Sequence, residues 1–386
     1  MLVCDRSKCT GCGACADACP KGCIEIRHDG NGFLHSYVDE NRCVGCKRCI
    51  QVCPVHHPQN HNTMLRSYKF RRKDTTAILG STSGGAAALL AETVIADGGA
   101  VCGCGFDAEL KLRHTVVTEP SGLEAFKGSK YVQSQTAGVY KAVQQVLKKG
   151  QKLLFVGTPC QVSGLKAFLG KEYENLITAD LVCHGVGSQK VLDRYIANHS
   201  GDQSICNIRF RSKQKGYIES QKNDLILEYP DGQKTVDHSK GIVLWFAAGI
   251  SLRESCYGCG FASMQRCADL TLADYIGENM TPEDRRYGVS MVFVNTEKGR
   301  SLLNRLADDA LMEELPLTQT QQRYLRLQQK RAVPKIRKKF FRDLDRLSLK
   351  ELEEKYTLQA ILPGKLSLYA RAAVNRFKRF IKVNRT

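Results

Sequence analysis

The chain begins with a cysteine motif that occurs twice, 34 residues apart. Each copy has the spacing C-x2-C-x2-C-x3-C-P, and the two copies consist of Cys9, Cys12, Cys15 and Cys19 before Pro20, and of Cys43, Cys46, Cys49 and Cys53 before Pro54. Three thiolates on one tight loop can bind three corners of a cubane 4Fe-4S cluster, so the fourth ligand must come from elsewhere. Gly11, Gly13 and Gly45 fit this arrangement, because a chain wrapped around a cluster needs backbone freedom.

This spacing resembles that of bacterial two-cluster ferredoxins, in which the last cysteine of each motif binds the other cluster. The resemblance assigns Cys9, Cys12, Cys15 and Cys53 to one 4Fe-4S centre, and Cys43, Cys46, Cys49 and Cys19 to the second. Disulfides or two zinc sites are the alternatives, but zinc sites usually show cysteine pairs rather than triplets with a trailing Cys-Pro. We therefore expect residues 1–58 to form an α+β ferredoxin-like module that carries electrons.

Length and composition limit what the rest of the chain can be. Beyond this module, most of the 386 residues are left, enough for one large domain or two ordinary ones. An apolar content of 42% indicates a globular chain, and no apolar run is long enough to span a bilayer. The N-terminus leads directly into the motif without a signal region, so we expect a cytoplasmic protein. In a reducing compartment, its 18 cysteines are better explained as metal ligands than as disulfides.

Positive charge is concentrated at the C-terminus. Residues 323–386 contain 19 Lys and Arg against five Asp and Glu, which accounts for most of the formal net charge of +18. The segments Lys335 to Arg346 and Lys365 to Lys382 place apolar residues at helical spacing among these cations. The sequence predicts a basic helical tail, which either packs on the domain or docks on an anionic membrane surface or an acidic redox partner. Nucleic acid is not expected, since no recognition motif accompanies the charge.

The region between the module and the tail alternates predicted strands and helices. Residues 59–74 are polar and basic and indicate a linker, after which residues 75–322 form the core. Helices are predicted over 86–96, 135–147 and 159–169, and strands over 100–104, 152–157 and 176–183. This alternation favours a mainly parallel α/β sheet.

Four further cysteines come from segments of the core that follow predicted strands or lie in tight turns. Cys160 joins a strand to a helix, Cys183 ends the next strand, and Cys256 and Cys259 form a C-x2-C pair. Together they suffice for one more 4Fe-4S centre. Zinc binding by the C-x2-C pair, or simple packing of buried cysteines, remains open from spacing alone.

Several segments of the core resemble the beta subunit family of deazaflavin-dependent (coenzyme F420) hydrogenases and formate dehydrogenases. They are SGGAAALL, KYVQS, LLFVGTPCQVSGLK, LITADLVCHGV, FRSKQKGY and SCYGCGFASMQRCADLTLADY. The resemblance implies an α/β core with FAD and a 4Fe-4S cluster held by Cys160, Cys183, Cys256 and Cys259. Relatives include reductases of the chlorophyll pathway, so substrate identity is not implied. Two departures are Ala273-Asp274-Tyr275-Ile276-Gly277, where Gly-Asp-Phe-Trp-Gly is usual, and an extra Cys267.

The candidate FAD contacts follow from glycine-rich and charged positions in these segments. They are Thr82, Ser83, Gly84, Gly85, Lys130, Tyr131 and Asp274. The turn before residue 86 would hold the pyrophosphate, because bare N–H groups and the helix dipole favour a phosphate there. A Ser-capped helix with small residues for close packing is the alternative. Asp274 could instead be a surface or capping carboxylate.

The remaining candidates are single residues. His184 could shuttle a proton, although a hydrogen-bonded histidine beside a ligand is more common. Arg209 and Arg211 share a strand face and could bind an anionic group, with a solvated face as the alternative. The cysteines outside the three groups, expected to be mostly packing residues, are Cys4, Cys23, Cys102, Cys104, Cys206 and Cys267.

Three functions are compatible with these patterns. The first is an FAD-dependent iron-sulfur oxidoreductase with three 4Fe-4S clusters that exchanges a hydride with a soluble substrate or the deazaflavin coenzyme. The second is an electron-transfer subunit that passes electrons to a separate catalytic partner. The third is a non-catalytic scaffold. The number of cofactor motifs favours the first, with reduced ferredoxin or another redox protein as partner, and no catalytic residue is assigned.

Overall fold

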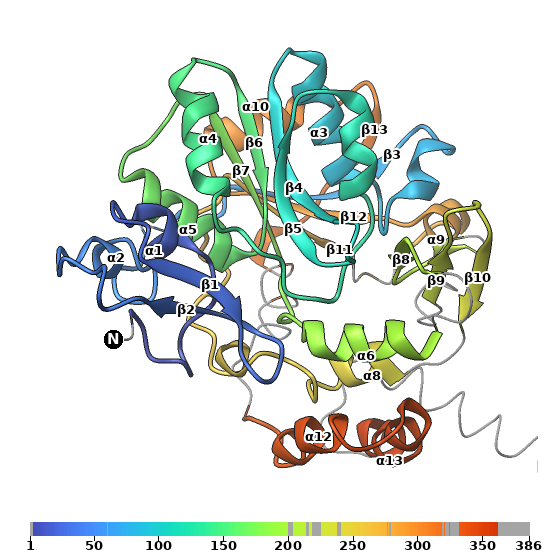
Figure 1. Ribbon diagram of the computed structural model, residues 1–386. Helices are drawn as coiled ribbons and strands as arrows, with labels where there is room; N and C mark the ends of the chain where they lie inside the picture. Colours follow the sequence, from blue (N-terminus) through green and yellow to red (C-terminus); the bar gives the residue numbers. More distant parts are fainter. Residues whose placement is uncertain are drawn as a thin grey trace, which may run out of the picture.

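A computed structural model describes the chain from residue 3 to residue 361, with gaps. The residues outside the described part are 1–2, 60, 200–203, 214–215, 218–224, 238–240, 276, 278, 319, 321–323, 325–331 and 362–386, and the side chains of 358–361 are not described either. Figure 1 shows a central sheet with helices around it, the N-terminal module in blue beside α5, and α12 and α13 in red beneath α6 and α8.

The N-terminal module consists of two short helices and a two-stranded sheet. Its elements are α1 (Ala14–Ala18), β1 (Ile24–His28), β2 (Leu34–Val38) and α2 (Arg48–Gln51). The strands are antiparallel, with Ile24 opposite Val38. The turn between them is closed by the Asp29 carboxylate, which accepts hydrogen bonds from the backbone N–H groups of Asn31 and Phe33. Both cysteine motifs lie on the loops and helices outside this sheet.

The central sheet has the strand order β13-β3-β12-β11-β7-β6-β4-β5. Its strands are β3 (Arg66–Arg72), β4 (Ala100–Phe106), β5 (Leu112–Val117), β6 (Leu153–Val156), β7 (Leu176–Leu181), β11 (Leu270–Asp274), β12 (Ser290–Val294) and β13 (Ala310–Glu314). The pairs β4–β6, β6–β7 and β7–β11 are parallel, and the other four pairs are antiparallel. The expected parallel arrangement therefore holds for the four central strands, whereas the whole sheet is mixed.

Part of the segment 59–74, which was expected to be a linker, is a strand inside the sheet. β3 pairs with β12 on one side and β13 on the other, and its Phe70 is fully buried. The segment looks polar because it contains several cations. In the fold two of them are neutralised by one acid, since Lys69 Nζ lies 2.9 Å and Arg71 Nε 3.1 Å from the carboxylate of Asp284. The linker prediction is therefore wrong over residues 66–72.

Helices cover both faces of the sheet. They are α3 (Ala86–Ala96), α4 (Val139–Lys148), α5 (Pro159–Leu169) and α10 (Glu297–Asn304). The chain also contains α9 (Pro282–Tyr287) and the 3-10 turns η1 (Ala77–Gly80), η2 (Pro120–Phe126) and η3 (Glu254–Cys256). Side chains alternate along β6, so that Leu154 packs with α3 and α10, whereas Leu153 and Phe155 pack with α4 and α5. The predicted helices over 86–96 and 159–169 are confirmed at these bounds.

The helix predicted over 135–147 begins later, at Val139, because its first turn is capped from outside. The Asp17 carboxylate of α1 accepts hydrogen bonds from the N–H groups of Gly138 and Tyr140, at 2.5 and 2.9 Å. Gly138 has a φ of 87°, a left-handed conformation that glycine tolerates. Since the cap comes from a distant part of the chain, no local pattern marks this helix start.

A second layer lies beneath the sheet. It contains α6 (Gln189–His199), α8 (Gly241–Ala247), α12 (Arg337–Leu344) and α13 (Leu349–Ile361), and a small antiparallel sheet of β8 (Asn207–Arg209), β9 (Leu225–Glu228) and β10 (Lys234–Asp237). Its core centres on Trp245, which packs edge-on against Phe340. The segment around Cys256 follows α8 of this layer and reaches the N-terminal module, where Arg253 bonds the Cys9 carbonyl.

The described part of the basic tail packs on the domain. Phe340, Leu352 and Tyr356 are fully buried, and the Asp343 carboxylate accepts hydrogen bonds from Lys355 and Tyr356. This agrees with the first of the two interpretations offered for residues 323–386. The segment Lys365 to Lys382 lies outside the described residues. Among the described helices, none combines the length and apolar character that crossing a membrane requires.

Candidate iron–sulfur and flavin site

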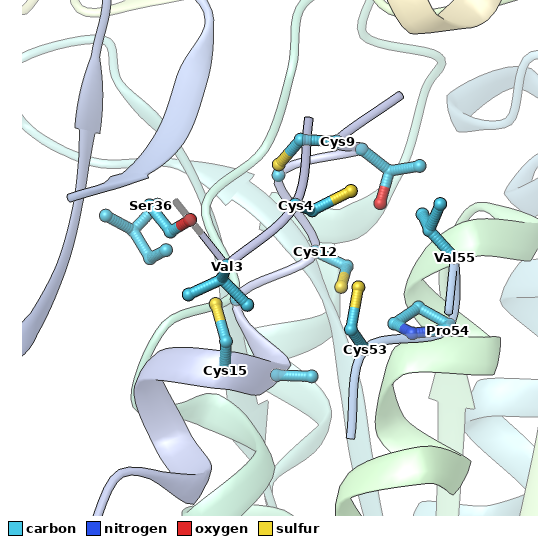
Figure 2. A pocket seen from close by; sticks show the side chains of 14 residues that line it. Val3, Cys4, Cys9, Cys12, Cys15, Ser36, Cys53, Pro54 and Val55 are labelled. Carbon is cyan, nitrogen blue, oxygen red and sulfur yellow. The ribbon is translucent and has the colours of Figure 1, made fainter. Parts of the chain in front are cut away.

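The cysteines predicted for the first 4Fe-4S centre line one cavity, which we call cavity I (Figure 2). Its cysteine lining is Cys4, Cys9, Cys12, Cys15 and Cys53. The loop that carries three of these thiols turns through Gly11 and Gly13, whose φ angles are 69° and 78°. A Cβ on Gly11 would lie 2.5 Å from the carbonyl oxygen of Leu34. Glycine is therefore required where the loop passes β2.

The cysteines predicted for the second centre line a separate cavity, cavity II. Its cysteine lining is Cys19, Cys23, Cys43, Cys46 and Cys49. Each cavity thus combines three thiols of one motif with the last cysteine of the other, Cys53 in cavity I and Cys19 in cavity II. This is the exchange that the ferredoxin resemblance predicts.

The chemistry of both cavities fits a cubane cluster. Besides the thiols, the lining of cavity I includes the apolar Val3 and Ile26, and that of cavity II includes Ile24 and Val38 together with Lys21 and Lys47. Burial raises the pKa of Cys15 to about 12, and nearby thiols add to the rise. Such a thiol ionises when a metal replaces its proton. None of the 18 cysteines, all of which the structure describes, is in a disulfide.

Two cysteines that the sequence indicated as packing residues are part of the cavities. Cys23 Sγ lies 3.3 Å from Cys19 Sγ in cavity II. Cys4 lies in cavity I, where its ligand atom and those of Cys53 and His56 are all within 4.8 Å of one another. Neither belongs to the repeated motif, so spacing gave no signal for them.

The four core cysteines also come together. Cys160 lies in the first turn of α5, Cys183 follows β7, Cys256 ends η3, and Cys259 lies three residues farther on. Burial raises the pKa of Cys160 to about 11 and that of Cys256 to about 12, and in both cases the neighbouring Cys259 thiol adds to the rise. Burial also raises the pKa of Cys183, with contributions from the other three. We call these four the core cysteine group.

Cavity I and the core cysteine group are neighbours. α1 packs on α5, where a Cβ on Gly164 would lie 2.9 Å from Cys12 Sγ. The Cys12 thiol is close enough to Cys160 for the two charges to interact. Thr136 Oγ1 donates a 2.6 Å hydrogen bond to the Cys12 carbonyl. The N-terminal module and the core are therefore one packed body rather than two separate units.

The turn predicted to hold a pyrophosphate is tightly packed. A Cβ on Gly84 would lie 2.2 Å from Phe70 O and 2.4 Å from Ser290 N. Ser83 Oγ donates to Val289 O, and Thr82 Oγ1 accepts from the N–H of Ser129. The alternative of close packing fits Gly84, but the suggested serine cap is wrong because Gly85 is the N-cap of α3.

The other predicted flavin contacts gather around this turn. Asp274 forms a 2.7 Å ion pair with Arg211, whose guanidinium lies 5.6 Å from the ring centre of Tyr131. Lys213, which the sequence did not single out, donates to the carbonyls of Ile78, Ser83 and Tyr287. Burial lowers the pKa of this lysine to about 7.

Buried donors without a protein partner occur in the same segments. In the described part of the chain, Arg211 Nε and Ser81 Oγ are buried and make no hydrogen bond. An anionic group bound at Arg211 would satisfy its Nε, so this region fits a phosphate-bearing cofactor. Lys130, by contrast, already donates to three backbone carbonyls, those of Cys104, Ala125 and Lys127.

The remaining candidates have structural partners. His184 Nε2 lies 3.2 Å from Phe246 O, and Arg209 forms ion pairs with Glu228 and Glu124 rather than sharing a partner with Arg211. Cys102 and Cys267 are buried in the core between the sheet and α5, which agrees with packing.

Comparison with known proteins identifies the two parts of the chain. Residues 8–57 match the family described as 4Fe-4S dicluster domain. Residues 150–320 match the family described as the C terminus of the coenzyme F420 hydrogenase/dehydrogenase beta subunit. The fold, the cysteine cavities and these matches define an iron-sulfur redox protein. More specifically, the chain joins a 4Fe-4S dicluster domain to a domain of the coenzyme F420 hydrogenase/dehydrogenase beta subunit family.

Individual relatives are more distant. An uncharacterized ferredoxin of Methanocaldococcus jannaschii is 47% identical over 36 residues, which are 9% of this chain. The chain thus spans about half the length (47%) of this curated relative. Among solved structures, the F420-reducing [NiFe] hydrogenase complex from Methanosarcina barkeri matches with a TM-score of 0.47 and 18% identity, over 70% of this chain and 90% of that one.

Proposed function

We propose that the protein is an iron-sulfur flavoprotein oxidoreductase in which three 4Fe-4S clusters connect a redox protein partner to FAD. The observation that carries the proposal is the serial arrangement of three cysteine groups, with Cys12 of cavity I beside Cys160 of the core cysteine group. We refer to the corresponding centres as cluster II (cavity II), cluster I (cavity I) and the core cluster. Such a chain moves single electrons through the protein interior.

Exposure defines the end at which electrons are exchanged with a protein partner. Cys46 in cavity II is exposed, and the adjacent Val44 is 60% exposed. Cys12 of cavity I is buried. Cluster II is therefore the centre that a docked carrier can approach most closely, and the core cluster is the farthest along the chain of contacts.

FAD, when bound, supplies the conversion between one-electron and two-electron transfer that a chain of cubane clusters lacks. Arg211, held by Asp274 and packed over Tyr131, would bind a negatively charged part of the cofactor through its unpartnered Nε. Ser81 Oγ, also buried without a partner in the described part of the chain, is a further candidate donor. Lys213 donates a hydrogen bond to the carbonyl of Ser83 and so holds this turn in place, which keeps the site preorganised.

The substrate we propose is a small soluble hydride acceptor or donor, and the deazaflavin coenzyme F420 named in the family description is the first compound to assay. A pure electron-transfer subunit is the alternative. It predicts reduction of the bound flavin by the clusters without hydride exchange with any soluble coenzyme. We also propose a cytoplasmic location, because so many free thiols require a reducing compartment.

Reversal of charge beside cavity II should slow electron exchange with an acidic carrier. Lys21 and Lys47 line this cavity and are exposed, so their ammonium groups are placed to attract carboxylates on a partner. We expect the double variant Lys21→Glu/Lys47→Glu to be reduced about tenfold more slowly by an acidic reduced ferredoxin at low salt. Stopped-flow absorbance measures the rate.

Two comparisons make this test specific. Reduction by dithionite should be unchanged, and the double variant Lys148→Glu/Lys149→Glu at the end of α4, which alters charge equally, should behave like the unmodified protein. Equal slowing in both double variants would mean that net charge, and not docking at cavity II, controls the rate.

A further inference from the structure

One arginine connects the two cysteine groups that lie in the interior. Arg253 precedes η3, so its own segment carries Cys256 of the core cysteine group. Its side chain reaches the N-terminal module, where Nε donates a 2.8 Å hydrogen bond to the carbonyl oxygen of Cys9 in cavity I. Its backbone N–H donates to Val186 O, close behind Cys183. The residue therefore contacts both ligand segments.

The guanidinium of Arg253 is a buried charge surrounded by neutral groups. The residue is 2% exposed. Its remaining partners are Leu34 O at 2.7 Å, Gln133 Oε1 at 3.1 Å, Ser255 Oγ at 3.1 Å and the His35 ring at 3.2 Å. None of the ion pairs found in the described part of the chain includes Arg253. The nearest acid of this network, Asp29, pairs with His35 instead.

A buried cation without a carboxylate needs negative charge from another source. The thiols of both cysteine groups are in range of it. The Nε of Arg253 bonds both the Cys9 carbonyl of cavity I and the hydroxyl of Ser255, which adjoins Cys256 of the core cysteine group.

We propose that Arg253 is the shared counter-charge of cluster I and the core cluster, which raises the reduction potential of both and holds their ligand loops together. This inference rests on the proposed function. A cubane with four thiolate ligands is negatively charged and gains one more negative charge with each electron, so a fixed cation stabilises the reduced form. Because one guanidinium lies beside both ligand loops, it raises the two potentials together. Arg253 is a positioning residue.

The test is an anaerobic redox titration of the full-length, cluster-loaded variant Arg253→Met, followed by electron paramagnetic resonance. We expect the ratio of reduced to oxidised cluster I and core cluster at a fixed potential to fall about tenfold, equivalent to about 59 mV for a one-electron couple. Cluster II serves as the control within the same molecule and should not shift. Equal shifts of all three clusters, or no shift in any of them, would overturn the inference.

Two further variants separate charge from structure. Gln133→Leu removes a neutral member of the same hydrogen-bond network, which bonds Leu34 N and Thr10 O, and should leave the potentials unchanged. Arg253→Lys retains the charge and should keep both potentials near those of the unmodified protein. If Arg253→Met binds less iron, retention of iron by Arg253→Lys supports a charge requirement, whereas loss in both variants contradicts it.

The outcome for the proposed function is measured separately. Unmodified protein that lacks one of the three clusters contradicts the proposed function, whatever Arg253 does. Unmodified protein with all three clusters, together with unshifted potentials in Arg253→Met, contradicts only the role of Arg253.

Discussion

A chain that ends at Val333 is expected not to fold. The truncation removes α12 and α13, whose buried side chains are Phe340, Phe341, Leu344, Leu349, Leu352 and Tyr356. Each buried apolar side chain contributes about 1.5–3 kcal/mol. The six together therefore contribute as much as the whole free energy of unfolding of a typical domain, roughly 5–15 kcal/mol. It also exposes Trp245, which packs against Phe340.

The measurement is the visible absorbance of the bound clusters together with thermal unfolding monitored by circular dichroism. A chain that ends at Ile361 retains both helices and is the matched control. The single variant Phe340→Ala should lower the free energy of unfolding by about 3–5 kcal/mol. A truncation at Val333 with unchanged absorbance and melting temperature would show that these helices are dispensable for the fold.

The substitution Cys160→Ala is expected to interrupt electron transfer between the N-terminal clusters and the flavin. Cys160 belongs to the core cysteine group and lies beside Cys12 of cavity I, so its loss removes a ligand at the point where the two sites meet. We expect iron to fall from about twelve to about eight per chain, since one cubane holds four iron atoms. Reduction of the flavin by a reduced ferredoxin should fall to background, while clusters I and II are still reduced.

The matched control is Cys102→Ala. Cys102 is fully buried on β4, packed in the core of the sheet, and belongs to neither cavity nor the core cysteine group. This variant should retain full iron content and flavin reduction. Flavin reduction at the normal rate in Cys160→Ala would contradict a route through the core cluster.

The cysteine arrangement was largely predictable because it depends on local spacing. The repeated motif predicted three thiols of each cavity, the ferredoxin resemblance added the exchange of Cys19 and Cys53, and the helix α5 began and ended as expected because Thr158 and Pro159 mark its start and Gly170 its end. These signals act over a few residues, and tertiary packing does not override them.

Features that depend on distant contacts were not predictable. The start of α4 is set by Asp17, which comes from the N-terminal module. Arg71 of β3 looks like part of a linker because its acidic partner lies more than 200 residues away. No sequence motif marks Arg253, because its partners Cys9, Leu34 and Gln133 come from three segments that meet only in the folded chain. The spacing of apolar residues among the cations of the tail left packing and docking as equal interpretations, because the partner that buries them, Trp245, lies far away in the chain.

The cofactor content of protein purified under anaerobic conditions tests the central claim most directly. Iron and acid-labile sulfide should each reach about twelve per chain, with one flavin, and electron paramagnetic resonance of the reduced protein should show three 4Fe-4S clusters that interact magnetically. About eight iron atoms, with only the two clusters of the N-terminal module, would contradict the core cluster and the serial route to the flavin. Zinc in place of iron in cavities I and II would contradict the electron-transfer account itself.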